Sequence, residues 1–192
     1  MNSKNKGGVF ERDCSRMLSL WWTDGKRDDA IWRSASSGAL TTVGRGRYLA
    51  HTGDFAATDV EAAPLFDKVI IEAKRGYNRY SVQDLLDVPV DSLRKNPVWE
   101  MFDKLATACQ AQHKIGLLLW KRDRRNLLAF CIDDGHLLGF YKTERLGFLS
   151  PGANWTSGMI WEQFASTVSA AQIKSLLVTP VASSSSTPSM SS

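Results

Sequence analysis

The segment FDKVIIEAKRGY, residues 66–77, constrains the fold more than any other part of the chain. Its centre holds three consecutive apolar residues, Val69, Ile70 and Ile71. Side chains of a strand alternate between its two faces, so this run is apolar on both. Such a strand needs cover on both faces and is expected at the centre of its sheet. The segment therefore predicts a mixed sheet with helices on either side.

The remaining signals agree with an α/β class. An apolar side chain recurs every three or four residues from Phe10 to Trp21, which indicates one buried helix face. Asn96 followed by Pro97 is typical of a helix start. The predicted elements, in chain order, are a helix over 9–22, strands over 30–35, 54–58 and 66–74, helices from Ser81 and Asn96, a hairpin of strands over 115–121 and 127–132, and one or two helices within 158–178. This order predicts a central mixed β-sheet of four to five strands flanked by helices.

The length and composition suit one domain. With 192 residues and 43% hydrophobic residues, the chain can bury one core of ordinary size. We expect a single domain over 1–181, with its core at about 7–135 and a helical extension over 156–178, followed by a disordered Ser-rich tail over 182–192. The sequence has no run of eighteen apolar residues and no secretory signal, so we expect a cytoplasmic protein without a membrane partner. The three cysteines lie in apolar patterns, which favours core packing over disulfides.

Positive charge is concentrated in one segment. The net charge is +4 and the isoelectric point is about 9.0, which is only mildly suggestive of a polyanionic partner. Within 114–125, Asp123 is outnumbered by five cations: Lys114, Lys121, Arg122, Arg124 and Arg125. The three histidines have no ligand spacing among themselves, so zinc chemistry is not expected.

Glu72 and Lys74 form the first candidate site. In a strand they project from the same face, about 7 Å apart at Cα, where the strand leaves the core. Such a pair is usually two ordinary polar residues at a strand exit. A buried carboxylate, however, needs a cation or a metal beside it.

Two further acids can join this pair. Asp54 begins a short predicted strand that is close enough in sequence to pair antiparallel with the Glu72 strand. Asp59 is the alternative acid, on the turn side of that hairpin. Glu11 lies at the margin of the buried face of the first helix, so it can face the sheet, although an acid there also complements a helix dipole.

The segments KGGVFERDCSRML and RSASSGA resemble the first helix of archaeal-type Holliday junction resolvases and the stretch that follows it. The runs EAKRGY and WKRDRR are similar to those of bacteriophage nucleases. The chain thus resembles the PD-(D/E)xK nuclease superfamily, whose order of acids and lysine is matched by Glu11, Asp54, Glu72, Ala73 and Lys74. The resemblance covers about 7–135. It departs from the motif at Gly53, which replaces a proline and leaves the carboxylate of Asp54 intact.

The resemblance implies a restriction-endonuclease-like core and a Mg²⁺-dependent DNA endonuclease, with Mn²⁺ as a substitute. Asp54, Glu72 and the Ala73 carbonyl would hold the principal ion. Glu11 would bind a second ion, directly or through water. Lys74 would orient the attacking water or stabilise the transition state.

The resemblance and the local charge also imply contacts with DNA. Arg33 and Ser37 match the segment after the first helix. The complete set of expected contacts is Arg33, Ser37, Arg45, Arg47, Arg75, Arg79, Lys121, Arg122, Arg124 and Arg125, each of which is also typical of ordinary surface charge. The substrate stays open between branched DNA, cut by a homodimeric, phage-encoded junction resolvase, and the DNA of restriction, repair or genome processing. The alternative function is a non-catalytic nucleic-acid-binding module on a nuclease-like scaffold.

Overall fold

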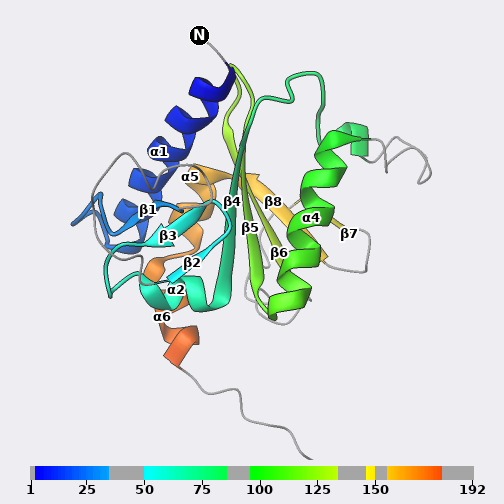
Figure 1. Cartoon of the computed structure of the whole chain (residues 1–192). Coiled ribbons are helices and arrows are strands. Elements are labelled where there is room, and N and C mark those ends of the chain that lie inside the picture. The colour runs from blue at the N-terminus through cyan, green and yellow to red at the C-terminus, as the bar shows by residue number, and fades with distance from the viewer. Residues whose placement is uncertain (1–2, 35–49, 86–95, 134–145, 150–154, 179–192) are drawn as a thin grey trace, which may run out of the picture.

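A five-stranded mixed sheet lies between helices, and a three-stranded antiparallel sheet adjoins it (Figure 1). The computed structural model describes residues 3–34, 50–85, 96–133, 146–149 and 155–178. Its helices are α1 (Ser3–Trp22), α2 (Ala63–Lys68), the 3₁₀ helix η2 (Gln83–Leu85), α4 (Pro97–Gln112), α5 (Trp161–Thr167) and α6 (Ala170–Val178). Its strands are β1 (Ile31–Arg33), β2 (Ala50–Thr52), β3 (Phe55–Ala57), β4 (Val69–Arg75), β5 (Ile115–Lys121), β6 (Leu127–Asp133), β7 (Leu146–Leu149) and β8 (Trp155–Ile160).

The position of β4 in the large sheet differs from the prediction. The strand order is β4-β5-β6-β8-β7, so β4 is an edge strand and not a central one. It runs parallel to β5, while the other neighbouring pairs are antiparallel. Its outer edge meets the three-stranded sheet through a single parallel bridge between Gly53 and Ile71. Although β4 lies at an edge, Val69, Ile70 and Ile71 are all buried, because both faces of the strand are covered.

Helices cover both faces, as predicted (Figure 1). On one face, α1, α2, α5 and the start of α6 form a core with residues that include Ile71 and Ala73 of β4. On the other face, α4 packs over Ile70, Leu118 and Trp120. The coarse prediction of a mixed α/β fold with a mixed sheet flanked by helices is therefore confirmed.

Two local predictions hold closely. The strands β5 and β6 form the expected antiparallel hairpin. Helix α4 begins as expected, since the Asn96 side chain accepts a hydrogen bond from the Val98 backbone at 2.9 Å and Pro97 occupies the first turn. At the other predicted helix start, the Asp84 backbone donates to Ser81 Oγ at 3.2 Å, but the described residues continue only as η2.

Several boundaries were wrong. Helix α1 starts at Ser3, earlier than expected, and residues 66–68 belong to α2 instead of the following strand. Residues 156–160, expected in a helical extension, form most of β8, and β7 was not predicted. The pairing of β8 with β6 explains this: Gly158 lies opposite Phe130, and a Cβ at Gly158 would come within 2.3 Å of that ring. The predicted tail lies outside the described residues.

Candidate functional site

Asp54 reaches β4 through a close backbone crossing at Gly53. Gly53 has φ +74, and a Cβ there would lie 2.4 Å from the Ile71 carbonyl oxygen. This approach is open only to glycine. The Asp54 backbone then donates to the same Ile71 oxygen at 2.9 Å. The predicted antiparallel pairing is wrong, because β3 pairs with β1 and β2, and the β-bridge found between this segment and β4 in the described residues is the parallel one from Gly53 to Ile71.

Ser34 holds the crossing from the other side, and sequence reasoning missed it. Its hydroxyl donates to the Gly53 carbonyl at 2.8 Å, and its backbone donates to the Asp54 carbonyl at 2.9 Å. Ser34 is buried directly after β1. A serine at a strand end has no distinctive sequence signal. The glycine at position 53 was interpreted only as the replacement of a proline, and its close approach to β4 was not predicted.

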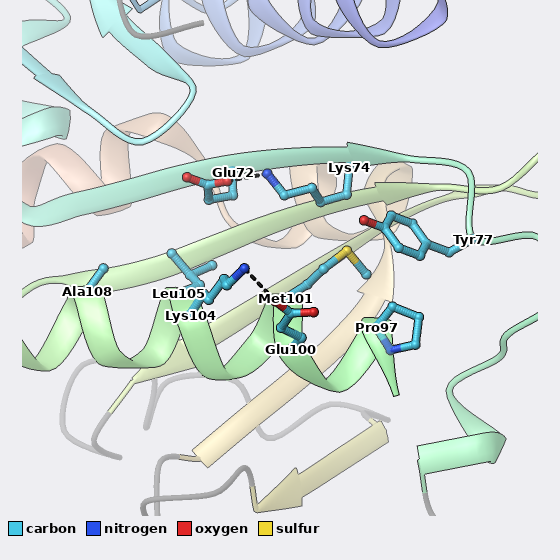
Figure 2. A pocket seen from close by; sticks show the side chains of 9 residues that line it. All are labelled: Glu72, Lys74, Tyr77, Pro97, Glu100, Met101, Lys104, Leu105 and Ala108. Carbon is cyan, nitrogen blue, oxygen red and sulfur yellow. Dashed lines mark hydrogen bonds and ion pairs between the residues drawn. The ribbon is translucent and has the colours of Figure 1, made fainter. Parts of the chain in front are cut away.

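The structure brings Asp54, Glu72 and Lys74 together, and we call these three residues the β4-end cluster. Asp54 Oδ2 accepts a hydrogen bond from the Ala73 backbone at 2.9 Å and another from Lys74 Nζ at 3.3 Å. Lys74 Nζ also donates to Glu72 Oε2. Glu72 and Lys74 follow Ile70 on the face toward α4, as the alternation predicted, and both line a pocket against that helix (Figure 2). One ammonium therefore contacts two carboxylates, one from β4 and one from the turn between β2 and β3.

The cluster is partly buried, which perturbs its protonation. Burial raises the pKa of Glu72, and the negative charge of Asp54 raises it further, against the opposing effect of Lys74. For Lys74, burial alone would lower the pKa, but Asp54 and Glu72 outweigh this effect and the pKa is raised. Lys74 is thus a firmly charged ammonium, and the cluster holds more negative charge than Lys74 relieves.

The donor set suits a hard divalent cation. Successive residues of a strand direct their backbone groups to alternate edges, and the Ile71 carbonyl points to the edge that carries Asp54. The Ala73 carbonyl, two residues on, therefore faces that edge too. Within the described residues no group of three or more acid, histidine or cysteine side chains gathers as a metal site. Two carboxylates and a carbonyl are nonetheless sufficient for Mg²⁺, which retains several waters.

Glu11 is not part of the β4-end cluster. Its carboxylate accepts a hydrogen bond from Arg33 Nε at 2.5 Å. Helix α1 packs on the Ile71 and Ala73 face of β4, opposite the face of Glu72 and Lys74. Burial raises the pKa of the Cys14 thiol on the same helix, and the negative charges of Asp13, Glu11 and Asp54 raise it further.

Asp59, the alternative to Asp54, belongs to a different cluster. It pairs with Arg27 and accepts a hydrogen bond from the Glu61 backbone at 2.9 Å. These two interactions lower the pKa of Asp59, with the backbone hydrogen bond as the larger effect. Asp54, and not Asp59, therefore lies against Glu72 and Lys74.

Several predicted DNA contacts lie beside the cluster, where β4 and β5 end. Arg75 is opposite Lys121 in the parallel register. The Arg122 guanidinium lies 5.1 Å from the Trp120 ring centroid and donates to the Tyr80 carbonyl at 2.7 Å. The remaining described members are exposed: Arg79, Arg124 and Arg125.

The other cationic residues are placed differently. Lys114 lies at the opposite end of β5, where its ammonium donates to the Phe66 carbonyl at 2.8 Å, so it does not add to the charge around 121–125. Arg33 is engaged by Glu11. Three predicted contacts lie outside the described residues: Ser37, Arg45 and Arg47.

Comparison with known proteins adds no family. No family model, curated protein or solved structure matches the chain. In the described part of the chain, no helix combines the length and apolar character needed to cross a membrane. The resemblance to nucleases therefore remains a prediction from the sequence, to be weighed against the geometry of the β4-end cluster.

Proposed function

We propose that the protein is a Mg²⁺-dependent DNA endonuclease with a restriction-endonuclease-like core. The observation that carries this proposal is the convergence of Asp54 and Glu72 on the ammonium of Lys74. The turn between β2 and β3 meets the end of β4 there. Both carboxylates are partly buried, and burial raises the pKa of Glu72. A carboxylate with a perturbed pKa beside a fixed cation is typical of functional sites.

Asp54, Glu72 and the Ala73 carbonyl would hold the ion. When bound, Mg²⁺ supplies charge neutralisation at the phosphoryl oxygens and a more acidic water. The carboxylates of this chain fix the position at which such a cation is stable, because positive charge relieves the part of their mutual repulsion that Lys74 leaves. Glu11 pairs with Arg33, and its helix packs on the face of β4 opposite to Glu72 and Lys74, so we assign it no ligand role at this ion.

Lys74 would act on the water and the phosphate. Its ammonium donates hydrogen bonds and stays charged near neutral pH, because both neighbouring acids raise its pKa. Held at the cluster, it can orient the attacking oxygen and offset the charge that grows on the phosphoryl group. The water oxygen would form the new bond to phosphorus as the bond to the departing oxygen breaks, and the proton that the water loses balances the one that the departing oxygen takes up.

The exposed arginines beside the cluster support a polyanionic substrate. Arg79, Arg124 and Arg125 are exposed near the end of β4 and β5, where DNA phosphates would have to pass to reach Lys74. Such contacts bind without reading sequence. The substrate class we favour is branched DNA, as in a four-way junction resolvase, which requires two copies of the chain for symmetric cuts.

A substrate panel tests the proposal. Purified protein is incubated with labelled linear duplex, flap and four-way junction DNA, with Mg²⁺ or with EDTA. We expect nicks that require the metal, and paired cuts restricted to the junction would select the resolvase. Mn²⁺ should restore cleavage after EDTA treatment. Wild-type protein that cuts none of the substrates in either metal would refute the endonuclease.

One observation favours a second candidate, a non-catalytic nucleic-acid-binding module. Lys74 already pairs with both carboxylates of the cluster, so the charges are partly satisfied without an ion. In that case the arginines would bind DNA while Mg²⁺ changed nothing. Binding that is equally tight with and without Mg²⁺, together with the absence of cleavage, would select this module.

A further inference from the structure

We propose that the pocket between β4 and α4 binds an unpaired nucleotide next to the phosphate that is cut. This inference rests on the proposed nuclease function and specifies its substrate. The pocket has a volume of about 400 Å³ and includes Glu72 and Lys74 in its wall (Figure 2). A ligand in the pocket would therefore touch the same side chains that carry the proposed reaction.

Tyr77 supplies an exposed aromatic face to this pocket. Among the described residues, Leu20, Val60 and Tyr77 are the exposed large hydrophobic side chains, and only Tyr77 lines this pocket. Its side chain comes from the loop that follows β4, at the same end of the pocket as Pro97 (Figure 2). An aromatic ring left open beside a charged cluster offers a surface on which a base can stack.

The loop that presents Tyr77 is held in place by several hydrogen bonds. The Gly76 backbone donates to the Lys121 carbonyl at 3.0 Å, and Trp120 Nε1 donates to the Gly76 carbonyl at 3.2 Å. On the far side, Arg122 donates to the Tyr80 carbonyl at 2.7 Å. Tyr77 itself has φ 56, a left-handed conformation that these contacts maintain. The ring is therefore positioned in advance and would lose little freedom on binding.

The rest of the pocket combines an apolar floor with a charged rim. Helix α4 contributes the apolar side chains Pro97, Met101, Leu105 and Ala108. Lys104 lies one turn beyond Glu100 and pairs with it at the rim, where both are exposed. Lys104 keeps its charge, because the hydrogen bond with Glu100 raises its pKa. A nucleotide has the matching chemistry, with an apolar base face and an anionic phosphate.

A paired base cannot use this floor. In a continuous duplex the bases stack inside and only sugar and phosphate reach the protein wall, so the exposed ring of Tyr77 would stay uncovered. A base that has left the stack can insert between Tyr77 and α4, at the cost of unstacking, which is smallest where DNA is already unpaired. The geometry thus favours flaps, junction arms and other sites with free bases over intact duplex.

The test compares two DNA probes that differ only in unpaired bases. Fluorescein-labelled duplexes of equal length, one with a three-nucleotide flap, are titrated without divalent metal, and the same pair is then cut with Mg²⁺. We expect wild-type protein to bind the flap probe about tenfold more tightly. Tyr77→Ala should lose that preference, and Tyr77→Phe should keep it. Both variants retain a Cβ at the left-handed position, so their melting temperatures control for folding.

The outcomes separate the two proposals. Equal wild-type affinity for both probes, or a Tyr77→Ala variant that keeps the preference, would overturn the pocket. A Tyr77→Phe variant that behaves like Tyr77→Ala would overturn the stacking role. A flap preference without any cleavage would uphold the pocket and refute the nuclease, whereas cleavage without a preference would uphold the nuclease and refute the pocket.

Discussion

Two clusters of this protein contain the same number of acids and bases, but an acid in one has a raised pKa and an acid in the other has a lowered pKa. The β4-end cluster joins Asp54 and Glu72 to Lys74, and the cluster around Arg27 joins Asp29 and Asp59 to that arginine. Each has two acids and one base. In the β4-end cluster burial raises the pKa of Glu72, whereas in the Arg27 cluster hydrogen bonds lower the pKa of Asp59.

The difference teaches that environment, and not the count of charges, separates a candidate site from a surface ion pair. The two bases differ in exposure, since Arg27 is 43% exposed and Lys74 is 31% exposed, but the two acids do not, since Asp59 is 24% exposed and Glu72 is 25% exposed. The acids differ in their partners: Asp59 accepts a hydrogen bond from the Glu61 backbone, whereas Glu72 lies beside the negative charge of Asp54. In the β4-end cluster the ionised form of Glu72 opposes folding. A position that costs stability in this way is typical of a site retained for function.

The largest expected effect is the loss of DNA cleavage on removing charges from the β4-end cluster. Lys74→Met and Asp54→Asn should each lower kcat/KM by about 100- to 1,000-fold, the range seen when one electrostatic contact to the reacting group is lost. The matched control is Asp59→Asn in the Arg27 cluster, which should keep cleavage within about twofold, since Asp59 pairs with Arg27 and is not part of the proposed site. Single-turnover cleavage assays measure both. Equal losses in the two clusters would remove the distinction between them.

The second prediction concerns the crossing that delivers Asp54. Gly53→Ala forces a Cβ against the Ile71 carbonyl and should cost about 1–3 kcal/mol of stability, or roughly 2–4 °C in Tm per kcal/mol. The displaced carboxylate should also lower cleavage nearly as far as Asp54→Asn.

Gly25 provides the control for the crossing, because it has a similar φ of +78 but a Cβ at this position would meet no atom within 4 Å. Gly25→Ala should cost about 1 kcal/mol, the conformational part alone, and leave cleavage unchanged. Thermal unfolding and cleavage rates are measured for both variants. A Gly53→Ala variant that keeps full cleavage would show that Asp54 does not depend on the crossing.

The third prediction uses pH to compare the clusters in metal-free protein. The pKa of Glu72 is raised in the folded protein, so the protonated form of Glu72 stabilises the fold. This stabilisation is lost as the pH rises from about 4.3, the value for an unfolded chain, through the folded pKa. Glu72→Gln has no such loss, so its Tm relative to wild type should increase from pH 4 to pH 7, by about 2–4 °C.

Asp59→Asn should behave in the opposite way. Because the pKa of Asp59 is lowered in the folded protein, its ionised form stabilises the fold above about pH 3.9, the value for an unfolded chain. This stabilisation is lost as the pH falls through the folded pKa. The variant should therefore be less stable than wild type near pH 7, by about 2 °C or less, and equal to it in acid. Differential scanning calorimetry over this range measures both. A Glu72→Gln difference that is independent of pH would contradict the raised pKa.

The smallest expected effect is on the salt dependence of DNA binding. Arg124→Ala should reduce the slope of log K against log salt concentration by about 1, because one phosphate contact is lost. Arg27→Ala, in the other cluster, should leave the slope unchanged. Fluorescence polarisation with a labelled duplex at several salt concentrations gives both values. An equal change in both variants would indicate that the charge near β4 has no special role in binding.

Local patterns predicted much of the fold. The Asn96 cap, the β5–β6 hairpin and the alternation along β4 are set by neighbours within a few residues, and all three are observed. The missed strand β8 shows where such patterns end. Its pairing depends on Phe130 of β6 lying over Gly158, a contact between residues that no short window contains.

The candidate site divides in the same way. The period of two along β4 was enough to place Glu72 and Lys74 on one face, because side-chain direction in a strand is a local property. The meeting of Asp54 with Lys74 was decided only by tertiary structure, through the crossing at Gly53. The exclusion of Glu11 from the cluster was decided in the same way, because α1 packs on the opposite face of β4. Distances between remote segments depend on how whole elements pack, and that information is spread over the entire core.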